Sequence, residues 1–252
     1  MSDPYVHSNL VNGIRRIEFF HPQSNSLPGK LLNELAETIR TAGNDANTHV
    51  IILQSPGEKA FCAGASFDEL IAIENEAEGL KFFSGFAHVI NAMRSTPQPI
   101  IARIQGKCVG GGVGVAAAAD YAIALDSASI KLSELAVGIG PFVVGPPVER
   151  KMGVAAYTQL ALDASSWRTA AWAREKGLFA EVHDSVTGLD AAIDRLADQL
   201  SKSNPEAMKD IKRVSWAGTA SWDTLLLERA AISGRLVLSA FTKNAIAQFK
   251  KK

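Results

Sequence analysis

The stretch GKCVGGGVGVAAAAD, Gly106 to Asp120, places three consecutive glycines between an apolar run, Pro99 to Ile104, and an alanine-rich segment. Gly112 to Ala117 also satisfies the G-x-G-x-x-A pattern of dinucleotide-binding turns. That pattern belongs in the first strand-to-helix turn of a βαβ unit of roughly 30 residues. Here it lies more than 100 residues into the chain, after at least four earlier elements. A Rossmann-type oxidoreductase is therefore kept only as a remote alternative.

The same glycines have a second interpretation. Gly110, Gly111 and Gly112 can adopt positive φ and let a ligand approach the main chain closely. The helix that follows directs unpaired N–H groups and the positive end of its dipole toward that ligand. Residues 62–65, CAGA, form a similar glycine turn that enters a helix. If the two turns face each other, they present two N–H donors to one developing oxygen charge. Taken alone, two tight structural turns explain these segments equally well.

The pattern of elements indicates an α/β body followed by helices. Asn12-Gly13, between two alternating segments, predicts a β-hairpin. Up to about residue 145, apolar strands alternate with helical segments, which indicates a mainly parallel sheet. After GPFVVGPPVER the pattern is mostly helical, and FAEVHD alone reads as a strand. The expected helices cover residues 153–176, 189–203, 205–217 and 221–249.

Composition and charge exclude several classes. The 252 residues are 47% apolar, enough for a full core, and Lys+Arg balance Asp+Glu at 26 each. With no net field, we expect no nucleic-acid partner. The longest apolar runs fall well short of the ~20 residues of a membrane span, and no secretory h-region is present. Cys62 and Cys108 are too few for a disulfide framework, so we expect a reducing, cytoplasmic location.

Metal and nucleophile motifs are absent or incomplete. The five histidines share no ligand spacing and the chain has no H-E-x-x-H, so we expect no metal site. Gly64 to Asp68 comes within one residue of a G-x-S-x-G nucleophile elbow but lacks the second glycine. We therefore expect Ser66 to serve as a helix N-cap or binding-loop serine rather than as a nucleophile.

Three motifs, EKAFCAGASFDEL, PIIARIQGKCVGGGVGVAAAADYAIA and IKLSELAVGIGP, resemble the crotonase (enoyl-CoA hydratase/isomerase) superfamily in order and spacing. HPQSNSLPGKLLNELAETI resembles the family's opening segment, and AFTKNAIAQFKKK is similar to its C-terminal end. The resemblance implies an α/β fold with a crotonase-like ββα spiral core, residues 1–190. It further implies a helical C-terminal region, residues 191–252, that mediates a homotrimer or a dimer of trimers. The implied ligand is an acyl-CoA thioester, with coenzyme A as part of the substrate and no further cofactor.

The resemblance also implies a site. The main-chain amides of Ala65 and Gly111 would form an oxyanion hole, and Glu134 would be the catalytic acid/base. Ser66 stands where the family often has Asp after AGA. Substrate-binding roles are implied for Ser24, Ser26, Leu27, Ala63, Gly64, Ser66, Phe67, Gly110, Gly114, Ser133, Val137 and Gly138.

The carboxylates depart from the family's hydratases, which commonly use two glutamates. The later one matches Glu134, and the earlier one falls on Gly114. Glu134 lies between an apolar strand and an apolar loop, where desolvation raises a carboxyl pKa toward a useful range. A single base suits a 1,3-proton shift better than addition of water. We therefore expect a hydratase/isomerase-type enzyme, with a 3-enoyl/2-enoyl isomerase or a methylglutaconyl-type decarboxylase as the alternative.

The segment after the third motif allows more than one interpretation. Bulky Phe142, Val143 and Val144 replace smaller residues of the family's run, which predicts either a narrow acyl pocket or plain core packing. Glu149 pairs with Arg150 at a subunit contact or stands in as a second acid. A family member that only binds acyl-CoA or a partner, without catalysis, is also compatible with these motifs.

Overall fold

The computed structural model describes residues 3–249 as two β-sheets surrounded by helices. The large sheet has the strand order β1-β2-β3-β5-β7-β10, in which only the β1–β2 pair is antiparallel. Its strands are β1 (Tyr5–Val11), β2 (Ile14–Phe20), β3 (Val50–Gln54), β5 (Ile100–Ile104), β7 (Tyr121–Leu125) and β10 (Glu181–His183). The small sheet, in the order β4-β6-β8-β9, contains β4 (Ala60–Cys62), β6 (Lys107–Val109), β8 (Ser129–Lys131) and β9 (Arg168–Thr169).

Successive strands divide between the two sheets in a regular way. β3, β5 and β7 enter the large sheet, and the strand that follows each of them, β4, β6 and β8, enters the small sheet. Each pair then leads into helical structure, so the chain advances as a spiral of ββα turns, as expected from the resemblance. The predicted hairpin is also confirmed, with Asn12 and Gly13 at positive φ between β1 and β2.

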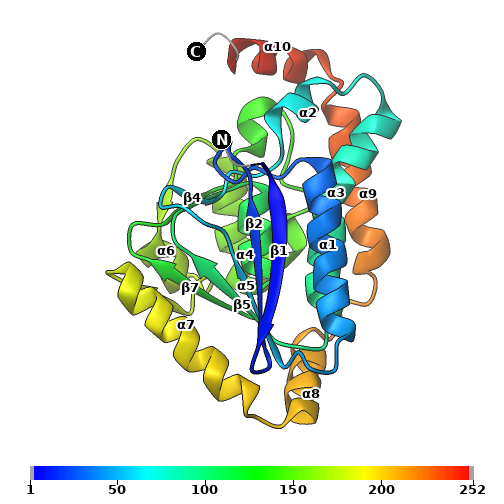
Figure 1. Ribbon diagram of the computed structural model, residues 1–252. Coiled ribbons are helices and arrows are strands. Elements are labelled where there is room, and N and C mark those ends of the chain that lie inside the picture. The colour runs from blue at the N-terminus through cyan, green and yellow to red at the C-terminus, as the bar shows by residue number, and fades with distance from the viewer. Residues whose placement is uncertain (1–2, 250–252) are drawn as a thin grey trace.

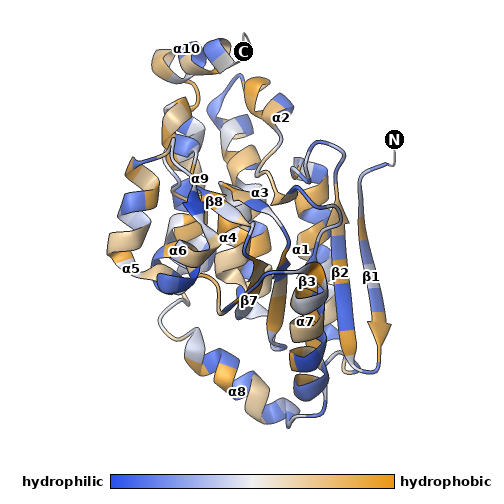
Figure 2. Ribbon diagram, turned by 90° about the vertical axis from the view of Figure 1, so that its left-hand side faces the viewer, coloured by the Kyte–Doolittle hydropathy of each residue, from blue (hydrophilic) through white to orange (hydrophobic). Residues whose placement is uncertain are grey.

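The central strands β3, β5 and β7 are mainly apolar and buried because helices cover both faces of the large sheet. One face packs against α1 (Gly29–Asn44), α3 (Glu76–Ser95) and α4 (Gly111–Ala118). The other face packs against α7 (Val186–Ser201), whose Leu189 and Ile193 contact the strands. Figure 1 shows α7 and α1 on opposite sides of the sheet, and Figure 2 shows the orange colour of apolar residues on the central strands.

The C-terminal helices return to the core. α8 (Pro205–Ser215) is followed by α9 (Trp222–Leu236), which runs along α3, and by α10 (Ala240–Phe249) next to α2 (Phe67–Ile71) (Figure 1). α3 and α9 cross at two glycines, since a Cβ built on Gly79 would lie only 2.7 Å from the Cα of Gly234. Ile139, Val237 and Ile246 form a small apolar cluster that joins α9 and α10 to the body.

The segment 153–176, expected to be mostly helical, is helical at its two ends but not throughout. α5 (Gly145–Leu162) begins earlier than expected, with prolines in its first turn, and has a break at Gly153 (φ 77°, ψ 160°), where the expected helix began. The short strand β9 precedes α6 (Ala170–Glu175). The pattern therefore missed the start of α5 and the non-helical residues 163–169.

The boundary between core and C-terminal region does not coincide with the end of an element. Position 190, the predicted division, falls inside α7, and the division stays a prediction. The last three residues of the AFTKNAIAQFKKK motif lie outside the described residues. Within residues 3–249, no helix combines the length and apolarity that crossing a membrane requires.

The glycine crossing of α3 and α9 can be tested by adding one methyl group. Gly79→Ala improves helix propensity, but its Cβ would overlap the main chain of Gly234, so we expect a net loss of about 1–3 kcal/mol of unfolding free energy. Urea denaturation measures this change in the free energy of unfolding. Gly29→Ala is the matched control, because its Cβ would meet its nearest neighbour at an ordinary 3.6 Å. Equal stability of the two variants would contradict a tight crossing.

Candidate active site

The three segments that the sequence analysis identified as candidate site segments lie together at one edge of the small sheet. β4, β6 and β8 are parallel neighbours, so their carboxyl ends lie side by side. The residues that follow these ends are 63–65, 110–111 and 132–134. The amide of Gly110 donates a 2.9 Å hydrogen bond to the carbonyl of Lys131, which ties the second segment to the third. Parallel pairing therefore brings together segments that are far apart in the chain.

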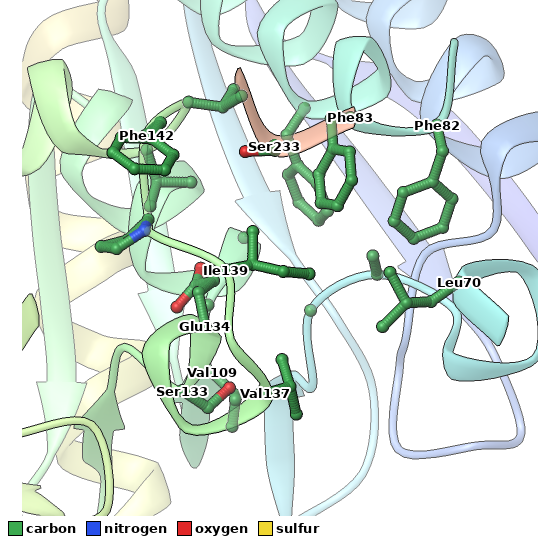
Figure 3. Close-up of a pocket in the computed structure, with 18 of the residues that line it drawn as sticks. Leu70, Phe82, Phe83, Val109, Ser133, Glu134, Val137, Ile139, Phe142 and Ser233 are labelled. Carbon is green, nitrogen blue, oxygen red and sulfur yellow. The ribbon is translucent and has the colours of Figure 1, made fainter. Parts of the chain in front are cut away.

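These segments border a cavity of about 220 Å³. Its walls are mainly apolar and come from α2, α3, α4, η1 (Glu134–Val137) and the loop before α5. Figure 3 shows Glu134 on one side of the cavity and Leu70, Phe82 and Phe83 on the other. The apolar lining residues are mostly large: Leu70, Phe82, Phe83, Phe86, Val109, Val137, Ile139, Phe142, Val143 and Val144.

Glycines permit the close approach of the two turns. Gly64 has φ +90°, and a Cβ on it would lie 3.0 Å from the carbonyl oxygen of Val109 and 3.7 Å from the nitrogen of Gly111. A Cβ on Gly111 would lie 2.2 Å from the ring of Phe86. A side chain at Gly64 would therefore push the two turns apart, and one at Gly111 would displace Phe86. Leu27 supports the first turn, because its amide donates to the carbonyl of Gly64 (2.8 Å).

Two main-chain amides at the cavity are free to receive a ligand. Ala65 and Gly111 both line the cavity, and within residues 3–249 neither amide donates a hydrogen bond to a protein acceptor. Gly111 is the first residue of α4, where helical geometry leaves the N–H groups of the first turn without partners. An oxygen atom placed between the turns can accept hydrogen bonds from both.

Glu134 supplies the carboxyl group of the cavity. Its Oε2 is buried and has no hydrogen-bond partner among the described residues. A Cβ on Gly110 would lie 2.9 Å from Oε1, so the carboxyl group lies directly against the second glycine turn. Burial raises the pKa of Glu134 from 4.5 to about 7. At neutral pH such a group exists in both protonation states, which suits it to accept a proton and return it.

The position that the resemblance assigns to a second glutamate is closed. A Cβ on Gly114 would lie 2.5 Å from Cγ1 of Val144, a buried residue of the cavity wall. No side chain fits at position 114 unless Val144 moves. Glu149, the candidate substitute for the second acid, is exposed on α5 and does not line the cavity. Within the described residues, Glu134 is thus the only carboxyl group of the cavity wall.

The structure brings most of the predicted site residues to this cavity. Those that line it are Ala63, Gly64, Ala65, Ser66, Phe67, Gly110, Gly111, Ser133, Glu134 and Val137. The remaining five do not line it: Ser24, Ser26, Leu27, Gly114 and Gly138. Ser24 and Leu27 support the first turn from the neighbouring loop, since the carbonyl of Ser24 accepts from the amide of Ala63 (3.2 Å). Gly138 ends η1 in the left-handed region.

The roles of Ser66 and of the Phe142 segment follow from their contacts. The Ser66 side chain accepts from the amide of Glu69 (3.3 Å) and caps α2, so the predicted N-cap role is confirmed. Phe142, Val143 and Val144 line the cavity, while the two valines also belong to the buried core. The core-packing interpretation is therefore confirmed for the two valines, and the acyl-pocket interpretation stays a prediction.

Several lining residues were not predicted from the sequence. Phe82, Phe83 and Phe86 lie on one predicted helix, where apolar spacing does not distinguish a cavity wall from a core contact. Ser233 comes from α9, in the region expected only to mediate oligomers. The remaining missed residues are Leu70, Val109, Ile139, Gly140 and Pro141.

Comparison with known proteins agrees with this geometry. The family model for enoyl-CoA hydratase/isomerase matches residues 9–245, nearly the whole chain. The chain belongs to the enoyl-CoA hydratase/isomerase family. Its fold matches the crystal structure of enoyl-CoA hydratase from Bacillus halodurans, with a TM-score of 0.89, 23% identity and coverage of 97% of this chain and 99% of that structure's chain.

Curated relatives show what chemistry the enoyl-CoA hydratase/isomerase family includes. A carnitinyl-CoA dehydratase of Proteus mirabilis is 28% identical over 218 residues, 83% of this chain and 79% of the relative. A (7aS)-7a-methyl-1,5-dioxo-2,3,5,6,7,7a-hexahydro-1H-indene-carboxyl-CoA hydrolase of Rhodococcus jostii is 32% identical over 124 residues, 49% of this chain and 48% of the relative. Family membership identifies this chain as a lyase- or isomerase-type enzyme and implies acyl-CoA thioester substrates.

The raised pKa of Glu134 predicts that its ionised form lowers the free energy of unfolding. Because the folded-state pKa of about 7 exceeds the ordinary 4.5, protonation of Glu134 stabilises the fold below pH 4.5, and this stability is lost as the pH rises through about 7. Glu134→Gln, which stays neutral, should therefore unfold at a higher temperature than wild type near pH 8. The difference should shrink toward pH 4.5. Thermal unfolding across this range measures it.

The control for this measurement is Glu149→Gln, which neutralises an exposed glutamate outside the cavity. Its stability should follow that of wild type at every pH. A Glu134→Gln protein that is no more stable than wild type at pH 8 would show that Glu134 is not desolvated.

Proposed function

We propose that this enzyme moves a double bond along an enoyl-CoA thioester, converting a 3-enoyl chain to a 2-enoyl chain. The observation that carries the proposal is the single buried carboxyl group, Glu134, whose pKa is raised to about 7 by burial. The proposal is supported by Val144, whose side chain fills the space that a second carboxylate at position 114 would need. The reaction uses no cofactor beyond the coenzyme A of the substrate.

In the proposed reaction, the thioester oxygen accepts hydrogen bonds from the amides of Ala65 and Gly111. Donors of this oxyanion-hole type each stabilise the developing charge by roughly 3–4 kcal/mol. Glu134 removes a proton from C2 as its C–H bond breaks, and the electrons spread into a dienolate. The protonated Glu134 then returns the proton to C4, while the double bond forms between C2 and C3. Proton, charge and electrons balance with no second reactant.

The coenzyme A part of the substrate is proposed to follow the two loops that the resemblance names. Ala63 to Phe67 lines the cavity, and the loop that contains Ser24, Ser26 and Leu27 is hydrogen-bonded to it. Gly110, Ser133 and Val137 complete the wall beside the thioester. Gly114 and Gly138 act through packing, the first beside Val144 and the second beside Phe241.

Hydration and decarboxylation fit the cavity less well. Addition of water is helped by two acid/base groups on the water and the α-carbon, and the described cavity wall offers only Glu134. Hydration or dehydration, the chemistry named for the Proteus mirabilis relative, is the second candidate. Decarboxylation of a methylglutaconyl-type chain lacks a cationic partner for the carboxylate, since no Lys, Arg or His is among the described lining residues.

We also propose that the chain assembles as a homotrimer or a dimer of trimers in the cytoplasm. Large apolar side chains on α5 and α10 are exposed: Leu162 and Phe241 at 70% each and Val154 at 61%. We take these side chains to be covered by another subunit, since contiguous exposed apolar patches mark interaction sites. Cys62 and Cys108 are both free and buried, which fits a reducing compartment. Light scattering at micromolar concentration should give three or six chain masses; a monomer would contradict the proposal.

The catalytic role of Glu134 can be tested by one substitution. Glu134→Gln should lower turnover of 3-hexenoyl-CoA by about a hundredfold or more, because it removes the proton acceptor. Binding of the unreactive hexanoyl-CoA should change little, since the amides of Ala65 and Gly111 are retained. Absorbance of the conjugated product measures turnover, and calorimetry measures binding.

Mass spectrometry of the products separates the candidate reactions. Isomerisation leaves the mass of 3-hexenoyl-CoA unchanged, while hydration of crotonyl-CoA adds one water and decarboxylation of 3-methylglutaconyl-CoA removes carbon dioxide. Glu149→Gln, which changes an exposed glutamate, should turn over 3-hexenoyl-CoA like wild type. Water addition faster than isomerisation, or a Glu134→Gln enzyme with most of its turnover, would overturn the proposal.

A further inference from the structure

Three serines line the cavity, and two of them, Ser66 and Ser133, belong to the segments beside the glycine turns and Glu134. The third, Ser233 of α9, is 2% exposed and lies among large apolar side chains, between Phe142 and Phe83 (Figure 3). Its Oγ makes no hydrogen bond with any described residue, 3–249, and Ser233 lines the cavity. Because the cavity is proposed to hold the substrate, a group of the substrate can hydrogen-bond this hydroxyl.

The side-chain hydrogen bonding of Ser233 differs from that of Ser84, the buried serine on the neighbouring helix α3. Ser84 of α3, 6% exposed, donates a 2.6 Å hydrogen bond to the carbonyl of Leu80, four residues earlier, which is the usual solution for a helical serine. Ser233 makes no such bond to its own helix within the described structure. Its hydroxyl is therefore available to a ligand without first breaking an internal hydrogen bond.

The glycine crossing of α3 and α9 is what places Ser233 at the cavity. A Cβ on Gly234 would lie 2.8 Å from the amide nitrogen of Leu80, so the two helices are in main-chain contact at this level. Ser233, the residue before Gly234, is thereby held against the wall that contains Phe83. A larger residue at the crossing would move α9 outward and withdraw the hydroxyl.

The surroundings limit which oxygen Ser233 can bind. The described lining residues include no Lys, Arg or His, so a carboxylate beside Ser233 would be buried without a counter-charge. A hydroxyl or a ketone oxygen carries no net charge, and a serine hydroxyl can donate to either and accept from the first. The geometry thus favours a neutral oxygen.

We propose that Ser233 is a specificity-determining residue that hydrogen-bonds a neutral oxygen on the acyl chain, beyond C4. The natural substrate is then an oxygenated acyl-CoA, with a hydroxyl or keto group, rather than a plain alkyl or a dicarboxylic chain. This inference rests on the proposed function only in that the acyl chain occupies this cavity. The hydroxyl contributes to recognition and takes no part in the proton transfer.

The test is a binding series with thioesters that cannot isomerise. Calorimetry compares hexanoyl-CoA, 5-hydroxyhexanoyl-CoA, 6-hydroxyhexanoyl-CoA and adipoyl-CoA on wild type and on Ser233→Ala. Wild type should bind at least one hydroxylated chain about 5- to 10-fold more tightly than hexanoyl-CoA, and adipoyl-CoA most weakly. Ser233→Ala should lose this preference and bind hexanoyl-CoA no worse than wild type does.

Ser84→Ala is the matched control, because Ser84 is a buried helical serine with an internal partner and no place in the cavity wall. It should retain the wild-type preference. Equal wild-type affinity for the hydroxylated and plain chains would overturn the proposal, as would a preference that survives Ser233→Ala. The wild-type comparison decides the matter even where a variant folds poorly.

The binding result is independent of the proposed isomerisation, because it requires no turnover. If the wild type prefers hydroxylated chains but does not isomerise 3-hexenoyl-CoA, the role of Ser233 stands and the proposed function is wrong. If it isomerises 3-hexenoyl-CoA but shows no preference in the binding series, the proposed function stands and the role of Ser233 is wrong.

Discussion

The structure of the site depends on the close approach of two main-chain turns at the carboxyl ends of β4 and β6. Gly64 has no side chain to hold the turns apart, since a Cβ on it would press on Val109, and Gly111 leaves room for the ring of Phe86. The small sheet brings these ends together, since its parallel pairing sets β4, β6 and β8 in order. Amides without internal acceptors are then available at the point where a thioester oxygen is proposed to bind.

A buried carboxyl group is set against these amides, and it works against the stability of the fold. Glu134 has one oxygen with no hydrogen bond, and its desolvation keeps the pKa near 7 instead of near 4.5. A salt bridge or a second hydrogen bond would stabilise the ionised form and lower that pKa, but the group would then be a weaker base. The apolar wall around it, which includes Phe82 and Val144, thus helps to keep the pKa of Glu134 raised.

Much of the fold and part of the site could be predicted from the sequence because the signals are local. Asn12-Gly13 specifies its hairpin, the glycine turns specify positions of close approach, and Ser66 caps its helix as expected. The non-helical stretch 163–169 was missed, because its strand β9 is only two residues long and pairs with the distant strand β8. Phe82, Phe83 and Phe86 were also missed, since the same side chains would serve equally well inside a core.

By itself, the sequence determined the alternation of strands and helices and the two glycine turns, and its family resemblance implied the ββα spiral and Glu134 as the acid/base. The first two features depend on φ preferences and apolar patterning, which are properties of short segments. Only the tertiary structure decided that Val144 fills the space beside Gly114 and that Ser233 of a C-terminal helix lies at the cavity. These contacts join residues far apart in the chain, and their existence depends on how helices and loops pack, with α3 and α9 meeting at Gly79 and Gly234.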